Sequence, residues 1–185
     1  FVPKKRNKKK FFILSTGRLV KQKNFELLID AVIKIKQKRD ISLLIIGEGN
    51  RENILKSKIK NLNFIKIIKW NENLRTYYKK ANLFVLSSFY EGSPNVLLDS
   101  INNNTPILAS NCSGVSDIIG NDKGYTFKIG DKNDLEKKIV YIMDNYINSV
   151  NRSKIAHKNL NKYTKENCNT YLNLINELEK NLKLQ

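Results

Sequence analysis

The residues best suited to chemistry follow the first apolar run of the sequence, in the segment Thr16–Asn24. Arg18 offers a planar fork of donors and Lys23 a compact point charge, a pair that suits a diphosphate. Gly17, directly before them, would let the backbone approach a ligand closely. In so basic a chain, this segment taken alone is better interpreted as carrying two ordinary surface cations.

A second segment, Ser87–Asp99, contains a helix start. Ser93 suits the N-cap position and Pro94 the first helical position. The N–H groups of the next three residues, beginning with Asn95 and Val96, would then be free at a helix N-terminus, where anions bind. The segment therefore predicts a phosphate cradle.

Two acids flank this helix start. Glu91 precedes it, and Asp99 lies about one and a half turns inside the helix. Carboxylates only accept hydrogen bonds, so the two suit the hydroxyl groups of a sugar or a ribose. As an isolated pair they are better interpreted without a ligand, Glu91 as an exposed loop acid and Asp99 as a solvated helix residue. A third segment, Asn111–Ile119, places small residues before another helix start and adds an amide-rich edge.

These segments depend on a scaffold of apolar strands that alternate with helices. We expect strands at Phe11–Leu14, Ile41–Ile46, Phe64–Ile68, Leu83–Leu86, Pro106–Ala109 and Tyr125–Phe127. We expect helices at Phe25–Ile35, Arg51–Lys60, Asn71–Lys80, Val96–Asn103, Leu135–Tyr146 and Tyr171–Leu182. Alternation with strands that are apolar throughout predicts an α/β fold, a doubly wound parallel sheet of the Rossmann-like kind. In such sheets ligands bind beyond the carboxyl ends of the strands, where the three segments lie.

The bulk properties fit one globular domain with acidic partners. The 185 residues include 34 Lys and Arg against 17 Asp and Glu, a net charge of +17 that favours nucleic acid, anionic membranes or phosphorylated ligands. Cys112 and Cys168 lie far apart, which argues against a disulfide scaffold and favours a reducing cytosol. No apolar run approaches the roughly 18 residues of a membrane span, and we expect no signal peptide.

We expect no metal and no other cofactor. The sequence has no Asp-x-Asp pair and no cluster of His and Asp to hold a cation. The charge of a phosphorylated ligand would instead be met by Arg18, Lys23 and a helix dipole. The single histidine, His157, falls in the polar helical stretch after the last strand, where we expect an exposed bystander.

Taken together, the segments resemble the C-terminal domain of the retaining group 1 glycosyltransferases, enzymes with the two-domain GT-B fold. The similarity covers nearly the whole chain, from about Phe11 to Leu178. It is strongest from Glu91 to Pro106 and over Ser113–Ile119, which read almost word for word like the family signature. The pattern is specific for the family but not for a substrate.

The resemblance implies a role for each matched residue. Arg18 and Lys23 match the pair that grips the donor diphosphate and stabilises the leaving nucleotide. Glu91 matches the acid that contacts the transferred sugar, and Asp99 takes the place of the acid that binds ribose hydroxyls. The remaining implied positions are Gly17, Gly92, Ser93, Pro94, Asn95 and Val96 around the donor, and Lys69 and Trp70 beside its base.

The sequence departs from the family pattern at two of these positions. Asp99 is one methylene shorter than the usual Glu, so we expect a weaker or water-mediated ribose contact. Ser93 replaces a common aromatic residue, so we expect a reshaped sugar pocket.

The resemblance also implies how the chain is organised and what it does. We expect a basic linker at residues 1–10 and a donor-binding domain at 11–185, without the family's N-terminal acceptor-binding domain. This half would bind a nucleotide-diphosphate sugar, by default UDP-linked, for retaining hexosyl transfer, and would be inactive alone. The pathway implied is synthesis of capsule, lipopolysaccharide or another cell-surface glycoconjugate. The expected location is the cytoplasm, with peripheral contact at the inner face of the cell membrane.

A rival interpretation from another class is a basic nucleic-acid-binding module. The run Lys4–Lys10 and the net charge of +17 would attract a phosphate backbone without sequence preference. No aromatic platform or recognised nucleic-acid motif accompanies the run, which is also what a solvated linker looks like. The same charge would dock an enzyme on anionic lipid.

Overall fold

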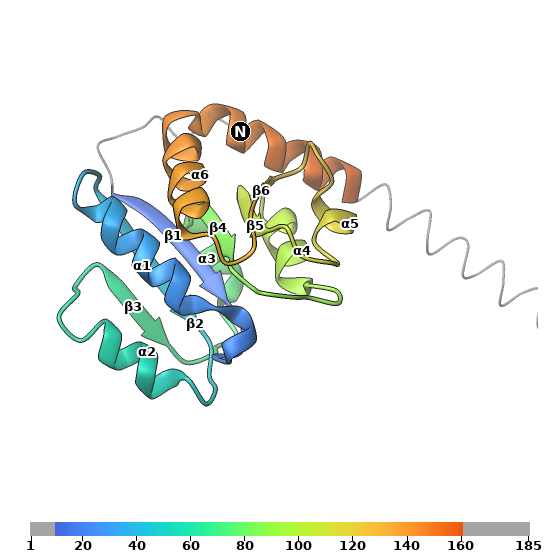
Figure 1. The fold of residues 1–185 in the computed structure, drawn as a ribbon. Helices are drawn as coiled ribbons and strands as arrows, with labels where there is room; N and C mark the ends of the chain where they lie inside the picture. The colour runs from blue at the N-terminus through green and yellow to red at the C-terminus, as the bar shows by residue number, and fades with distance from the viewer. Residues whose placement is uncertain (1–9, 161–185) are drawn as a thin grey trace, which may run out of the picture.

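Short apolar strands form one parallel sheet in the computed structural model, which describes residues 10–160 (Figure 1). The strands are β1 (Phe11–Thr16), β2 (Ile41–Ile46), β3 (Ile65–Ile68), β4 (Leu83–Leu86), β5 (Ile107–Ser110) and β6 (Tyr125–Phe127). The helices are α1 (Phe25–Lys36), α2 (Glu52–Lys58), α3 (Leu74–Lys80), α4 (Asn95–Asn102), α5 (Ser116–Ile119) and α6 (Lys132–Asp144). A 3₁₀ turn, η1 (Lys21–Lys23), precedes α1, and a further helix covers 146–160.

The strand order is β3-β2-β1-β4-β5-β6, with every neighbouring pair parallel. This is the order of a Rossmann-like sheet, so the predicted fold class is confirmed. The order reverses between β1 and β4, which pair through Ile13 with Leu83 and Leu14 with Phe84. Chain segments leaving these two strands diverge to opposite faces, and the crevice between them is where such sheets bind ligands.

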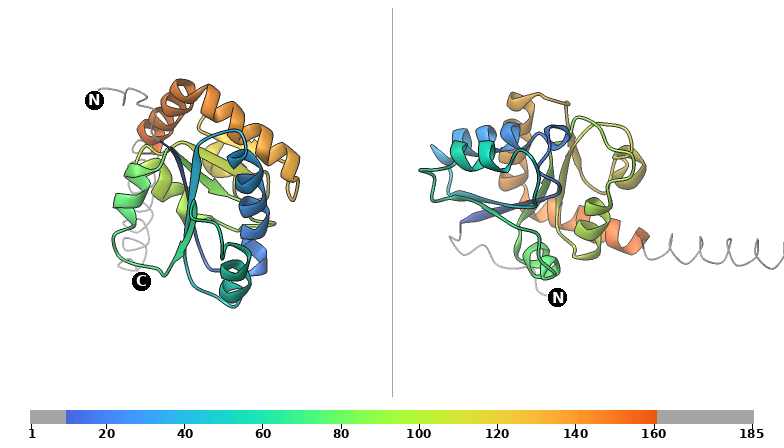
Figure 2. Two further views of the ribbon diagram at one scale, coloured as in Figure 1. Left: turned by 90° about the vertical axis from the view of Figure 1, so that its left-hand side faces the viewer. Right: turned by 90° about the horizontal axis from the view of Figure 1, so that it is seen from below.

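Alternation along each strand divides the core into two halves, one on each face of the sheet. In β1, Ile13 packs with the cluster under α1, α2 and α6, whereas Leu14 packs with the cluster under α3, α4 and α5. Val85 and Phe84 divide in the same way in β4. Figure 2 shows the resulting three layers, with helices on both sides of the sheet. Burial on both faces explains why the strands are apolar throughout.

The helix at 146–160 covers the second of these faces. It packs Ala156 into that cluster, and the Ser153 hydroxyl donates to the Asn104 carbonyl oxygen over 3.1 Å. His157 is half-buried, with Nδ1 at 3.1 Å from the Ile101 carbonyl oxygen. The prediction of an exposed His157 was therefore wrong, because the helix packs on the end of α4. The basic linker up to Lys9, Cys168 and the predicted helix Tyr171–Leu182 lie outside the described residues.

Candidate active site

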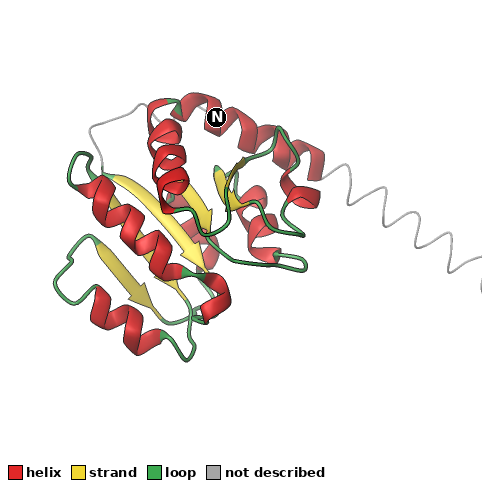
Figure 3. Cartoon of the chain, in the orientation of Figure 1, coloured by secondary structure: helices red, strands yellow, loops and turns green. Residues whose placement is uncertain are grey.

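Two of the predicted site residues, Lys23 and Glu91, form an ion pair at the switch point of the sheet. Lys23 ends η1 in the loop after β1, and Glu91 lies in the loop after β4. Figure 3 shows how such loops connect the strands of the sheet to the helices on its two faces. Lys23 Nζ lies 2.6 Å from Glu91 Oε1, and the two side chains are only 12% and 8% exposed. Desolvation offsets much of the attraction in a pair this buried, but losing one partner would leave an uncompensated buried charge. The sequence placed them 68 positions apart, and the sheet brings them together.

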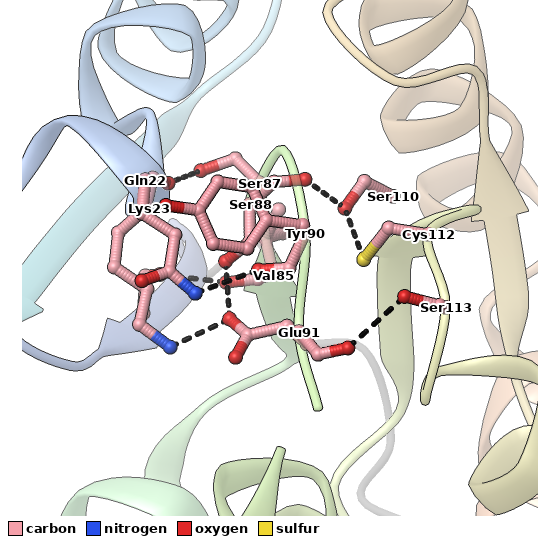
Figure 4. A network of polar contacts seen from close by, with 11 residues as sticks. Gln22, Lys23, Val85, Ser87, Ser88, Tyr90, Glu91, Ser110, Cys112 and Ser113 are labelled. Carbon is pink, nitrogen blue, oxygen red and sulfur yellow. Dashed lines mark hydrogen bonds and ion pairs between the residues drawn. The ribbon is translucent and has the colours of Figure 1, made fainter. Parts of the chain in front are cut away.

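A set of serine hydroxyls holds Glu91 in place (Figure 4). Ser88 Oγ donates to Glu91 Oε1 over 2.5 Å, and Ser113 Oγ donates to the Glu91 carbonyl oxygen over 3.2 Å. Ser110, at the end of β5, donates in turn to the Ser88 carbonyl oxygen over 2.5 Å. Hydrogen bonds from serines that follow β4 and β5 or end β5 therefore hold the Glu91 side chain, its backbone and the neighbouring Ser88.

The loops after β1 and β4 are also joined through Gln22. Its carbonyl oxygen accepts the Phe89 N–H over 2.8 Å, and its side-chain amide donates to the Tyr90 carbonyl oxygen over 2.7 Å. Ser87 Oγ adds a 2.8 Å bond to the Lys23 carbonyl oxygen. Because backbone groups of both loops take part, the Lys23–Glu91 distance is set by the loops themselves.

A cavity of about 440 Å³ opens beside this ion pair. It is lined by Gly17, Arg18, Gln22, Lys23, Gly47, Glu48, Trp70, Glu91 and Val96. The Arg18 side chain is exposed, in contrast to Lys23. The cavity therefore joins two cations, a buried acid and an exposed aromatic ring, a combination that suits an anionic ligand with an aromatic part.

The far wall of the cavity comes from the ends of β2 and β3. A side chain at Gly47 would overlap the Gly17 carbonyl oxygen, so only glycine lets the two loops approach this closely. Trp70 is 52% exposed. Lys69 does not line the cavity, but its Nζ lies 3.7 Å from Glu48 Oε1 at the cavity wall.

The start of α4 differs from the prediction. The N-cap is Pro94, the helix begins at Asn95, and no side chain caps it, so assigning Ser93 to the N-cap was wrong. The backbone at Pro94 has ψ 85°, outside the helical region, which moves the helix start by one residue. The Asn95 N–H donates to the Ser93 carbonyl oxygen over 3.0 Å and the Leu97 N–H to that of Pro94 over 2.9 Å. Two of the three amides expected to face an anion are therefore already engaged.

Several other predicted donor-binding residues lie beside the cavity, not in its lining. Val96 lines it, but Gly92, Ser93 and Asn95 are exposed next to it and Pro94 is buried. Their roles toward a donor stay predictions.

Asp99 lines a different cavity. A second cavity, of about 430 Å³, runs between α3 and α4 and is lined by Leu74, Arg75, Tyr78, Asp99, Asn102 and Asn103. Tyr78 lines this second cavity, and its hydroxyl lies 2.9 Å from Thr16 Oγ1 and donates to the Val96 carbonyl oxygen over 3.3 Å. Partial burial raises the pKa of the Asp99 carboxyl. The fold thus does not bring Asp99 into the cavity of Lys23 and Glu91.

Sequence reasoning missed four residues of this site: Gln22, Gly47, Glu48 and Ser88. Gly47, Glu48 and Ser88 closely follow the ends of buried strands, a position that sequence reasoning could have used, whereas Gln22 lies in η1, farther along the loop after β1. Nothing in their residue types alone distinguishes them from ordinary loop residues.

The described part of the chain shows neither a cluster of metal ligands nor a membrane-spanning helix. Within residues 10–160 no three His, Cys, Asp or Glu side chains gather as they would around a metal ion. Cys112 is a buried free thiol. Over the same residues, no helix combines the length and apolar character that spanning a bilayer requires.

The chain is similar in sequence to known glycosyltransferases. The family model described as "Glycosyl transferases group 1" matches residues 1–166. A Campylobacter jejuni enzyme, N-acetylgalactosamine-N,N'-diacetylbacillosaminyl-diphospho-undecaprenol 4-alpha-N-acetylgalactosaminyltransferase, is 33% identical over 129 residues. The match covers 67% of this chain and 35% of that enzyme. The lipopolysaccharide core biosynthesis glycosyltransferase LpsE of Rhizobium meliloti is 26% identical over 151 residues, 79% of this chain and 42% of that protein.

Solved structures share the fold. A mutant of S. aureus TarM, crystallised with fondaparinux, α-GlcNAc-glycerol and UDP, superimposes with a TM-score of 0.81. The match covers 94% of this chain and 37% of that one, at 22% sequence identity. The chain therefore spans between a third and a half of the length of these three proteins.

Proposed function

The chain belongs to the group 1 glycosyltransferases, and we propose that it binds the nucleotide-diphosphate sugar donor in the cavity beside Lys23 and Glu91. The single observation that carries this is the convergence of Arg18, Lys23 and the buried Glu91 on one cavity from two loops of the sheet edge. A diphosphate is the ligand whose charge matches the two cations. The UDP in the TarM complex supports a uridine nucleotide.

The proposed chemistry uses these cations on the leaving group. As the glycosidic bond to the diphosphate breaks, negative charge builds on the departing nucleotide, and Arg18 and Lys23 would stabilise it from fixed positions. Lys23 is already held by Glu91 and by the loop contacts, so little reorganisation is needed when the diphosphate binds. In this proposal the charge is met without a divalent metal, and the transfer retains anomeric configuration.

Other residues at or near the cavity are proposed to bind the sugar, the base and the ribose of the donor. Glu91 would accept hydrogen bonds from hydroxyl groups of the transferred sugar. Trp70 lies at the cavity with an exposed ring on which the base would stack. A ribose contact from Asp99 would require the donor to reach past Tyr78 toward the second cavity.

We further propose that the complete enzyme acts in synthesis of a cell-surface polysaccharide or glycoconjugate. The Campylobacter relative carries a diphospho-undecaprenol acceptor in its name, and the Rhizobium relative belongs to lipopolysaccharide core synthesis. An acceptor of that kind would place the enzyme at the inner face of the cell membrane, with the acceptor bound by a part of the enzyme that this chain does not contain.

Calorimetric titration with UDP tests the nucleotide site. Arg18→Ala and Lys23→Ala should each weaken UDP affinity about tenfold or more, because a hydrogen bond to a charged group contributes about 1.5–3 kcal/mol. Lys21→Ala is the matched control, since Lys21 is an exposed neighbour in η1 that does not line the cavity. Equal affinity of the wild type and both variants would remove the cations from the site and refute the assignment.

A further inference from the structure

The Ser88 hydroxyl is the least accessible polar group that contacts Glu91. Ser88 is 0% exposed, and its Oγ lies 2.5 Å from Glu91 Oε1. The same carboxylate oxygen receives Lys23 Nζ at 2.6 Å. A carboxylate oxygen has about two lone-pair sites, so the two donors saturate Oε1.

The other oxygen of Glu91 is then the one free to serve a ligand. Figure 4 shows the dashed lines to Ser88 and Lys23 meeting on one carboxylate oxygen of Glu91, while the other carries none. Two donors that converge on Oε1 from different loops fix the rotation of the carboxylate about its last bond, a torsion that otherwise has a broad range. Fixed rotation gives Oε2 one direction in which to accept a hydrogen bond.

Ser88 is itself held on rigid backbone. It follows β4 by two positions, and its carbonyl oxygen accepts the Ser110 hydroxyl at the end of β5. The hydroxyl therefore transmits the geometry of the sheet to the carboxylate, which loop residues alone would hold less precisely.

We propose that Ser88 is a positioning residue for sugar selectivity: it locks Oε1 of Glu91 with Lys23, so that Oε2 alone reads the hydroxyl groups of the donor sugar. The inference rests on the proposed function of this cavity. It assigns Ser88 no contact with the donor, and it separates recognition of the sugar from recognition of the nucleotide.

The test is the ratio of affinities for a UDP-sugar and for UDP, measured by calorimetry on the 185-residue chain. The sugar is the one in a UDP-sugar panel with the largest wild-type ratio. Ser88→Ala should lower that ratio about tenfold, the value of one oriented hydrogen bond to a charged group, with UDP affinity within about twofold of wild type. Ser100→Ala is the control, because Ser100 is also 0% exposed and also donates its hydroxyl, in this case to the Thr105 carbonyl oxygen over 3.1 Å, but does not line the cavity beside Glu91.

A second pair of variants separates positioning from general loosening of the fold. In a Glu91→Ala background, Ser88→Ala should lower the ratio no further, because the group through which it acts is gone. If Ser88→Ala loses its folded circular dichroism, Ser88→Cys replaces it, since a thiol of similar size is a much weaker donor.

The outcomes distinguish the two proposals. A wild-type chain that binds neither UDP nor any UDP-sugar would overturn the proposed function itself. A chain that binds UDP but prefers no UDP-sugar, or a Ser88→Ala variant with an unchanged ratio, would overturn the role of Ser88 and leave the nucleotide site standing. An equal fall for Ser88→Ala and Ser100→Ala would also overturn it.

Discussion

At the residue scale, the Lys23–Glu91 pair changes how each member is understood. As isolated residues, one was expected to bind phosphate and the other sugar. Joined at 2.6 Å, they leave the empty cavity with less net positive charge than its cations alone would give it. In the proposed complex a diphosphate would share Lys23 with Glu91, and the acid proposed to bind the sugar would lie next to the cation proposed to bind phosphate.

Asp99 provides a prediction about pH at the same scale. Burial raises the pKa of its carboxyl, so the folded chain binds a proton more readily than the unfolded chain. The charged form therefore destabilises the fold above that pKa, and the penalty disappears as pH falls through it. Asp99→Asn should raise the melting temperature at neutral pH, with the gain shrinking to nothing near about pH 3, where the acid is protonated in both states.

Thermal melts of both proteins across this pH range check the prediction. Glu72→Gln serves as the control, because Glu72 is an exposed acid at which no such gain is expected. A gain for Asp99→Asn that persists undiminished at low pH would show that burial of the charge is not its cause.

At the scale of elements, the cavity is lined by the loops after β1, β2, β3 and β4, and the loop after β5 supports it without entering the lining. The loop after β5 packs against the loop after β4 through Gly114, whose φ of 77° favours glycine. A side chain there would overlap the Gly92 carbonyl oxygen and crowd that of Glu91. The contact explains why the third segment matters although its residues line no part of the cavity.

Gly114→Ala should therefore lower the free energy of unfolding by about 1–3 kcal/mol, from backbone strain together with the clash. Gly92→Ala is the matched control, since a side chain at Gly92 would meet no atom within 4 Å. Urea denaturation of the two variants and the wild type measures the difference. Equal stability of the two variants would contradict the close packing of these loops.

At the scale of the whole molecule, the net charge of +17 is compatible both with a nucleic-acid partner and with a small phosphorylated ligand. The nucleic-acid alternative predicts tight binding to mixed-sequence DNA, whereas a donor-binding domain predicts only weak attraction to its phosphates. We expect DNA binding that is measurable at about 50 mM salt and lost at about 200 mM, because it depends on counterion release. UDP binding should persist at the higher salt.

Gel shifts at the two salt concentrations, beside UDP titrations in the same buffers, check this expectation. DNA binding that survives at the higher salt and exceeds UDP affinity would favour the nucleic-acid module. In the same preparation we expect no transfer of sugar, because the chain spans about a third of its Campylobacter relative. Turnover by the 185 residues alone would contradict that expectation.

The sequence by itself determined the strands, their parallel arrangement and the cations of the site. Apolar runs such as Ile41–Ile46 are buried on both faces, and this requirement is visible in composition. Arg18, Lys23 and Glu91 could be identified because the segments that carry them follow such runs and because the chain resembles a family. Apolar runs and the short motifs after them are local properties, which can be recognised from residues that are neighbours in the sequence.

Only the tertiary structure decided which of these residues meet. The Lys23–Glu91 pair and the Ser88 contact depend on the register of β1 against β4. The position of Asp99 in a second cavity depends on the placement of α3 beside α4. Distances between loops follow from how strands pair and helices pack, and no local pattern encodes them. The helix start at Asn95 was missed for a related reason, since the fold holds Pro94 outside the helical region whatever its propensity.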